Sequence, residues 1–266
     1  MTPAAEDLYR GDATSDLIAT RNSTSYLTTV WTPSAQSGWD SSNWKNLYNI
    51  NYFLVNIDKA TKAGEAEKTH WRAVARFWRA MFYYNKVRTF GAVPWYEAPI
   101  DADDEEQLYK ARDSREFVMK KVLEDLDYAC ENCSADSKWF TTANIHKWIA
   151  TAYKSRVCLF EGTYRKYHST DPSTGAAWTA DESDMYLQEC VKACEALMDC
   201  GVYSLLANPG AVDTQYRSLF NSDELQRQEV IWGREAATSG TYHSCTWESN
   251  NNNSQAWSVT ANLAYM

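Results

Sequence analysis

Long hydrophobic runs are missing from this sequence, and so is any excess of basic charge. No stretch approaches the roughly 20 apolar residues that a transmembrane helix needs, and the first residues lack the basic and apolar regions of a secretory signal. Lysine and arginine total 26 against 35 aspartate and glutamate, which gives a formal net charge of −9. Nucleic-acid phosphates are normally met by a basic face. The composition therefore argues against nucleic-acid binding.

Motifs for catalytic or metal chemistry are missing too. The sequence has no G-x-S-x-G, no glycine-rich phosphate loop and no H-E-x-x-H, and its 4 histidines have no further ligands at metal-binding spacing. The acidic run 101–106 is contiguous, whereas glycoside hydrolysis needs two carboxyl groups facing each other across a sugar. An odd count of 7 cysteines does not suggest a disulfide framework. We expect no catalytic residue, no metal and no cofactor.

Aromatic residues with a polar group are abundant instead, with 12 tryptophans and 17 tyrosines against 8 phenylalanines. Such rings pack in cores and also stack on sugars and other flat ligands. Aromatic residues of all kinds are densest in residues 66–100, where apolar positions follow two faces at helical spacing and predict a helix packed on two sides. Gly91 and Pro94 predict the end of this helix. A stripe at helical spacing indicates core, so we do not expect ligand here.

Further helices are predicted on both sides of this one. Residues 40–61 and 66–89 should form an antiparallel pair, because the linker between them is short. In the first of these helices, Tyr48 and Val55 are placed on the apolar stripe, which Asn51 interrupts. The remaining three helices are expected to begin at Asp113 or Ser114, at Thr142 and at Asp181–Glu182, and the last two are expected to end at Gly162 and Gly201.

Helix pairs repeated along a chain are typical of a tetratricopeptide-like stack. We predict an all-α fold of antiparallel helix pairs with long irregular loops. The chain is expected to be one domain over 1–266, with a helical core at about 40–205 and a loop-rich region at 206–266, where Gly, Pro, Asn and Ser predominate. A short helix is expected near Ala5–Tyr9.

Several core and turn motifs follow one another in a specific order. They are Trp44-x3-Tyr48-x-Ile50-x2-Phe53-Leu54, the stretch ARFWRAMFYYNKVRTFGAVPW, Arg112-Asp113-Ser114 with Asp125-Leu126-x2-Ala129, the helix TTANIHKWIATAYKSRVCLFEG, Gly201-Val202-Tyr203-Ser204-Leu205, and Tyr216-x2-Leu219-Phe220 followed by Glu229-Val230-Ile231-Trp232. In order and spacing, the chain resembles the SusD/RagB family from about residue 40 to 232.

Members of that family are lipid-anchored outer-membrane proteins that bind glycans in Bacteroidetes nutrient-uptake systems. The resemblance implies glycan binding without catalysis, delivery to a SusC-like TonB-dependent transporter, and a surface-exposed position at the cell outer membrane. Family members are longer, with a lipoprotein signal and a lipidated cysteine at the start. We therefore expect this chain to be an internal fragment, truncated at both ends, without the lipid anchor.

The resemblance also indicates where ligand-binding residues lie, namely before the first helix pair and after the Glu229–Trp232 turn. Trp39, at the start of a helix, is the leading platform for stacking on a sugar, and the alternative is that it packs on the helix. The candidate ligand-binding residues are Arg21, Trp31, Trp39 and Asn43 before the pair, and Tyr242, Trp247 and Trp257 beyond the turn.

Two other functions remain open at this point. A helical-repeat adaptor would bind a protein or peptide, and it predicts exposed aromatic residues on the concave helical face rather than on the loops. An all-helical glycoside-acting enzyme would require two loop carboxylates near the proposed platform.

Overall fold

The computed structural model describes residues 18–20, 38–140, 144–172, 174–206, 214–216, 219, 225–233 and 257–259. The chain divides into two units, one of residues 39–234 and the other of 1–38 with 235–266. In the second unit, strand β1 (Ile18–Thr20) pairs antiparallel with strand β2 (Trp257–Val259). The helix expected near Ala5–Tyr9 lies outside the described residues. The single domain over 1–266 stays a prediction.

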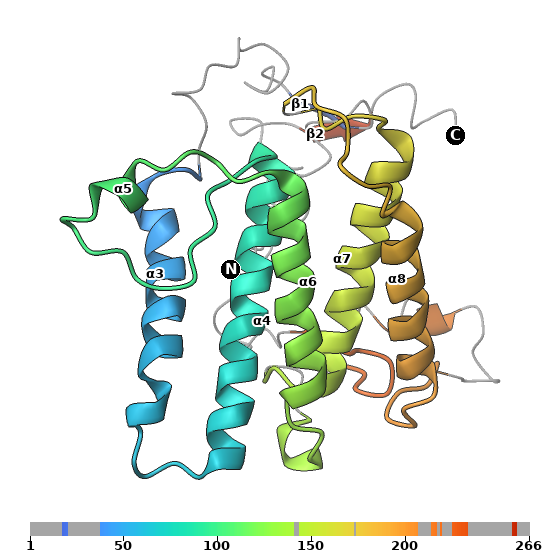
Figure 1. Ribbon diagram of the computed structural model, residues 1–266. Helices are drawn as coiled ribbons and strands as arrows, with labels where there is room; N and C mark the ends of the chain where they lie inside the picture. The colour runs from blue at the N-terminus through green and yellow to red at the C-terminus, as the bar shows by residue number, and fades with distance from the viewer. Residues whose placement is uncertain are drawn as a thin grey trace. The chain divides into compact units, whose positions relative to one another are not determined.

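Long helices pack one on the next in the described part of unit 39–234 (Figure 1). They are α3 (Ser41–Asn56), α4 (Glu65–Phe90), α6 (Arg115–Asn132), α7 (Lys147–Tyr167) and α8 (Ser183–Met198). The connections contain the short pieces η3 (Ile57–Lys59), α5 (Glu105–Leu108) and η4 (Ser137–Trp139). Successive long helices run in alternate directions. The predicted all-α, tetratricopeptide-like fold is confirmed.

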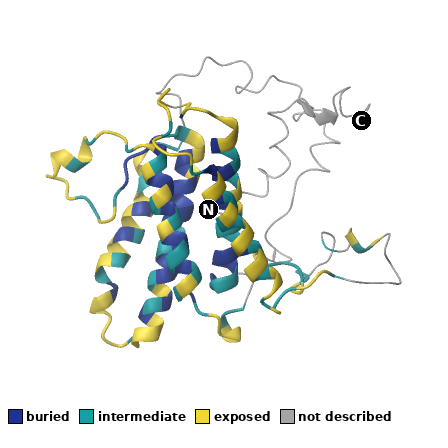
Figure 2. Ribbon diagram, turned by 45° about the vertical axis from the view of Figure 1, so that its right-hand side comes forward, coloured by how far each residue is buried: buried dark blue, intermediate teal, exposed yellow. Residues whose placement is uncertain are grey.

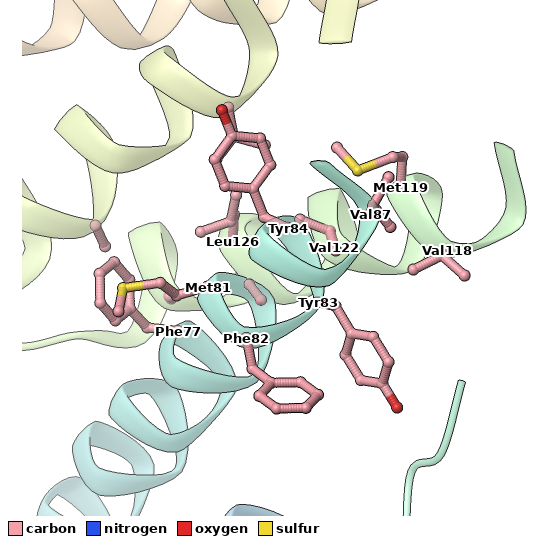
Figure 3. Packing of buried hydrophobic residues seen from close by; sticks show 14 of the residues in the cluster. Phe77, Met81, Phe82, Tyr83, Tyr84, Val87, Val118, Met119, Val122 and Leu126 are labelled. Atoms are coloured by element: carbon pink, nitrogen blue, oxygen red, sulfur yellow. The ribbon is translucent and has the colours of Figure 1, made fainter. Parts of the chain in front are cut away.

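Helix α4 provides a larger share of the core than any other helix, as its two apolar faces predict. Phe77 and Tyr83 are fully buried, and Figure 3 shows neighbouring residues of α4 packed against the apolar face of α6. On another side, the ring of Phe77 lies 5.3 Å from that of Tyr153 in α7. Figure 2 shows the resulting pattern, with buried residues on the facing sides of the helices and exposed ones outside. Helix α4 ends where predicted, because Gly91 takes a positive φ of 68°.

Buried carboxylates connect adjacent helices through ion pairs. Asp125 of α6 is 1% exposed and accepts a hydrogen bond from Arg79 Nε of α4 at 2.7 Å. Glu161 of α7 is fully buried between Arg115 of α6, at 2.7 Å, and Arg165 of its own helix, at 2.9 Å. An ionised group can be buried at tolerable cost only when it is paired in this way.

The starts of α6 and α8 agree with the sequence. Ser114, one of the two expected caps, accepts a hydrogen bond from Phe117 N at its Oγ, over 3.2 Å. Helix α8 begins at Ser183, directly after the acidic pair that was expected to open it. Gly201, with φ of 68°, follows its end.

The start of α7 differs from prediction. Helix α7 begins at Lys147, and its cap is His146, whose Nδ1 accepts a hydrogen bond from Trp148 N at 3.3 Å. The expected cap, Thr142, lies outside the described residues. Ile145, which was expected inside the helix, is buried just before it.

Gly162 does not end α7, which continues to Tyr167. A Cβ atom at Gly162 would lie 2.8 Å from Cγ of Leu187 in α8 and 3.0 Å from the carbonyl oxygen of Ser183. Such distances are shorter than van der Waals contact, so a side chain at this position would push the helices apart. The glycine is explained by the close approach of α7 and α8, not by a helix stop.

The apolar stripe predicted on α3 is wrong in part. Tyr48 and Val55, expected within it, are 48% and 52% exposed, whereas Asn51, expected to interrupt it, is 1% exposed. The helix also ends at Asn56 and continues as the turn η3, short of residue 61. A buried amide is stable in such a place only when its hydrogen bonds are made, and Asn51 makes them with the loop that follows α4.

Candidate functional site

A cleft of about 1020 Å³ lies between the first half of α3 and the loop that joins α4 to α6. Both sides belong to the unit of residues 39–234. The α3 side carries Trp39, Ser41, Ser42, Trp44, Lys45, Leu47, Tyr48 and Asn51, and the loop side carries Pro94, Tyr96, Ala98, Pro99, Ile100, Leu108, Lys110 and Arg112. Its lining thus combines aromatic rings, hydroxyl groups and cationic side chains.

The loop side of the cleft is held closed at its base. Asp113 N donates a hydrogen bond to Val93 O at 3.2 Å, and the Asp113 carboxylate accepts one from Trp95 N at 2.7 Å. The ring of Trp95 lies 4.2 Å from that of Tyr83 in α4, centre to centre, and Tyr83 Oη accepts a hydrogen bond from Tyr96 N at 2.7 Å. These contacts explain why the loop leaves α4 and returns to α6 at neighbouring points.

Asn51 connects the two sides of the cleft. Its Nδ2 donates hydrogen bonds to Tyr96 O at 2.9 Å and to Ala98 O at 3.5 Å. Its Oδ1 accepts a hydrogen bond from Arg79 at 3.5 Å, and Arg79 is in turn paired with Asp125. The chain of contacts runs from the buried ion pair to the wall of the cleft. Satisfied networks of this kind hold a single arrangement.

The first turn of α3 is built around Asp40. The Asp40 carboxylate accepts hydrogen bonds from Ser42 Oγ and from both the backbone and the side chain of Asn43, the backbone one over 3.1 Å. These hydrogen bonds, that from Ser42 first, lower the pKa of Asp40 to about 2. Asn43, a predicted ligand-binding residue, is thus engaged in the cap and is not among the cleft's lining residues.

Trp39 lines the cleft and also packs on the helix start. Its role as a platform for sugar stays a prediction. Its ring makes edge contacts with Trp44 at 5.3 Å and with Phe90 at 4.8 Å. The guanidinium carbon of Arg112 lies 4.6 Å above the ring centre. Arg112 therefore covers one face of the ring, which an unaided sequence pattern would not indicate.

Tyr48 is the most exposed aromatic ring in the cleft, and sequence reasoning missed it by assigning it to the core. It stacks on Tyr52, one turn further along α3, with ring centres 6.3 Å apart and planes 19° apart. Tyr52 is 56% exposed. Two tyrosines four residues apart, with polar Asn49 beside Tyr48, were the available signal for an exposed aromatic surface.

The structure does not describe the side chains of the other predicted ligand-binding residues. Trp257 lies in β2, where the structure describes the backbone alone. Arg21, Trp31, Tyr242 and Trp247 lie outside the described residues, and they stay predictions.

Metal ligands do not cluster in the described part of the chain, where no group of three or more His, Cys, Asp or Glu could hold an ion.

Burial raises the pKa of Cys130 to about 11 and those of Cys133 and Cys158 to about 12, so these thiols stay protonated at neutral pH. Among the helices described, none is long and apolar enough to cross a membrane.

Comparisons with known proteins agree with this fold. The SusD-like family, described as starch-binding and associating with the outer membrane, matches residues 5–150. A SusD-like protein of Formosa agariphila is 22% identical over 201 residues, which cover 74% of this chain and 32% of that protein. The chain thus spans about a third of the length of this curated relative.

Solved structures show the same helical fold. A SusD-like protein from Bacteroides fragilis superposes with a TM-score of 0.63 and 22% identity, covering 88% of this chain and 42% of that one. A structure determined with a xylogluco-oligosaccharide has a TM-score of 0.51 and 20% identity, covering 77% and 38%.

The described helices form a tetratricopeptide-like stack with an aromatic-lined cleft beside α3. With more than half of its length matched by one family, this chain belongs to the SusD-like family. Carbohydrate binding at the outer membrane, rather than catalysis, is the activity that this family is known for.

Proposed function

We propose that this protein binds an oligosaccharide in the cleft beside α3 and delivers it to a SusC-like TonB-dependent transporter at the surface of the outer membrane. Two lines support the proposal. The chain belongs to a family described as starch-binding, and one structure of similar fold was determined with a xylogluco-oligosaccharide. The cleft itself offers the groups that recognise sugars.

The cleft's composition is the observation that carries the proposal. Sugar recognition needs an aromatic ring against the apolar face of a pyranose and polar groups that reach its hydroxyls. Tyr48 and Trp39 supply rings, and the hydroxyls of Ser41 and Ser42 lie on the same side. The volume of about 1020 Å³ is at the upper end of small-molecule sites. An oligosaccharide of a few rings therefore fits better than a single sugar.

A binding screen tests the proposal. The parent protein and the variants Tyr48→Ala and Trp39→Ala are compared by isothermal titration against soluble polysaccharides and their oligosaccharides. Loss of a stacking ring costs roughly 1 kcal/mol, so each variant should bind about fivefold more weakly. Tyr167→Ala is the matched control, because Tyr167 is 83% exposed at the end of α7 and does not line the cleft.

The same screen separates the two proposed positions of the site. Trp247→Ala removes a candidate beyond the Glu229–Trp232 turn. Unchanged affinity in Tyr48→Ala and Trp39→Ala, with reduced affinity in Trp247→Ala, would move the site away from the cleft. No binding to any glycan would refute the function.

The adaptor alternative is favoured by one observation, an exposed apolar surface on α3 outside the cleft. Tyr52, Phe53 and Val55 are 56%, 41% and 52% exposed. A protein partner bound there would lose affinity in Phe53→Ser while glycan binding stays unchanged. The enzyme alternative would need two facing carboxylates, and the residues described as lining the cleft include neither Asp nor Glu.

A further inference from the structure

The charged residues that line the cleft are all cationic. Lys45, Lys110 and Arg112 are the three, and none of the described lining residues is acidic. The chain as a whole has the opposite character, with 35 acidic residues against 26 basic ones. A positively charged cleft raises the local concentration of negatively charged ligands.

Two of these three cations have no anionic partner among the residues that the structure describes. Lys110 is engaged, since its Nζ lies 2.9 Å from the Asp113 carboxylate and donates to Trp95 O at 3.0 Å. Lys45 and Arg112 are exposed and form no ion pair within the described ranges. Their charges are therefore available to a ligand.

Arg112 is held in a position suited to an anion. Its guanidinium lies over the ring of Trp39, 4.6 Å from the ring centre. A guanidinium that contacts a ring through its face keeps its in-plane N–H donors for other partners. Those donors form a fork that matches the two oxygens of a carboxylate or a sulfate.

The carboxylates nearest in sequence have partners of their own. Asp40 accepts hydrogen bonds from Ser42 and Asn43. Asp113 is paired with Lys110, and Asp104 caps α5 through a hydrogen bond from Gln107 N at 3.1 Å. The acidic run 101–106 adds negative charge to the tip of the loop, but none of its side chains lines the cleft.

From this arrangement we propose that the ligand of the cleft is an acidic oligosaccharide, whose sugars carry carboxylate or sulfate groups bound by Lys45 and Arg112. This proposal rests on the proposed glycan-binding function and adds the chemical class of the ligand. Tyr48 and Trp39 would provide binding common to any sugar, and the two cations would provide the selectivity for charge.

Matched pairs of probes test the proposal. Oligogalacturonate is compared with its methyl ester, and dextran sulfate oligosaccharide with dextran, by isothermal titration at low and high salt. A charge-assisted hydrogen bond contributes enough to change Kd about tenfold. We expect at least one acidic probe to bind about tenfold more tightly than its neutral counterpart, with the difference shrinking at high salt.

Charge-removing variants locate the effect. Lys45→Gln and Arg112→Gln should each weaken binding of the acidic probe about five- to tenfold and change binding of the neutral probe by less. Lys62→Gln makes the same charge change in the exposed connection between α3 and α4, outside the cleft, and should change neither. Melting temperatures of all three variants confirm that they are folded.

The outcomes distinguish this inference from the function on which it rests. Equal affinity for acidic and neutral probes, or equal losses for both in Arg112→Gln, would overturn the acidic ligand while glycan binding stands. Failure of every glycan, neutral or acidic, would overturn the function itself. Preference for the uronate pair or for the sulfate pair identifies which anionic group is recognised.

Discussion

Replacing Glu161 with glutamine tests the energetic role of the buried ion pairs. The side chain keeps its shape and one acceptor oxygen but loses its negative charge. In the parent protein, that charge is paired with both Arg115 and Arg165. All three residues are at most 4% exposed. Removing one partner of a buried ion pair typically costs 3–5 kcal/mol, because the other charge is left unpaired.

The structure places the expected cost near the lower end of that range. Arg165 keeps a second carboxylate, since its Nη1 lies 3.0 Å from Glu182. Arg115 has no other ion pair in the described part of the chain, and it retains its contacts with the rings of Tyr164, at 3.7 Å, and Phe160, at 5.9 Å. The variant therefore leaves one buried guanidinium without a carboxylate partner rather than two. We expect a loss of about 3 kcal/mol in the free energy of unfolding.

Urea denaturation, followed through the helical circular dichroism band at ~222 nm, measures this loss of stability. Glu124→Gln is the control, because Glu124 forms an exposed pair with Lys121 on α6 at 3.1 Å. Such pairs contribute about 0–1 kcal/mol. A cost below about 1 kcal/mol for Glu161→Gln, with an unchanged m value, would refute the argument that the charge is unpaired in the variant.

Other features of the stack lead to further expected outcomes. Gly162→Ala should destabilise the protein by about 1–2 kcal/mol in the same urea assay, since the clash with Leu187 outweighs the gain in helix propensity; a stabilised variant would contradict the close approach. Asn51→Leu should cost about 1–3 kcal/mol, because buried donors and acceptors lose their partners, and should speed proteolysis in loop 94–112; unchanged cleavage would contradict the link. Burial lowers the pKa of His146 to about 4, so the neutral form stabilises the fold above pH 6.5, and this stabilisation is lost as the pH falls toward 4. His146→Asn, which can still cap α7, should flatten the unfolding midpoint across that pH range, and an equally steep profile would show that other groups titrate.

The helical stack could be predicted from the sequence because its signals are local. Two apolar faces on α4 and the Gly91–Pro94 exit depend on residues close together in the chain. The errors occurred where a distant partner decides the outcome. Asn51 is buried because its hydrogen bonds lie about 45 residues away, and Gly162 is required by Leu187 of another helix.

The candidate site was predicted less well for the same reason. Trp39 was identified from its place at a helix start, and it does line the cleft. Its pairing with Arg112, and the exposure of Tyr48, depend on how the loop after α4 folds back beside α3. No periodicity in the sequence encodes that return, so the cleft appears only when both segments are placed in space.

The loop between Val93 and Asp113 is closed at its base, so its tip can vary in length. Because the two ends are joined to each other and to α4, the tip can be lengthened without moving the helices that flank it. Doubling the length of a flexible loop costs only about 0.6 kcal/mol in closure entropy. Insertions near residues 101–106 can therefore supply new contacts at the cleft's edge while the fold keeps its stability. In this loop, the sequence of the tip and the stability of the fold can change independently.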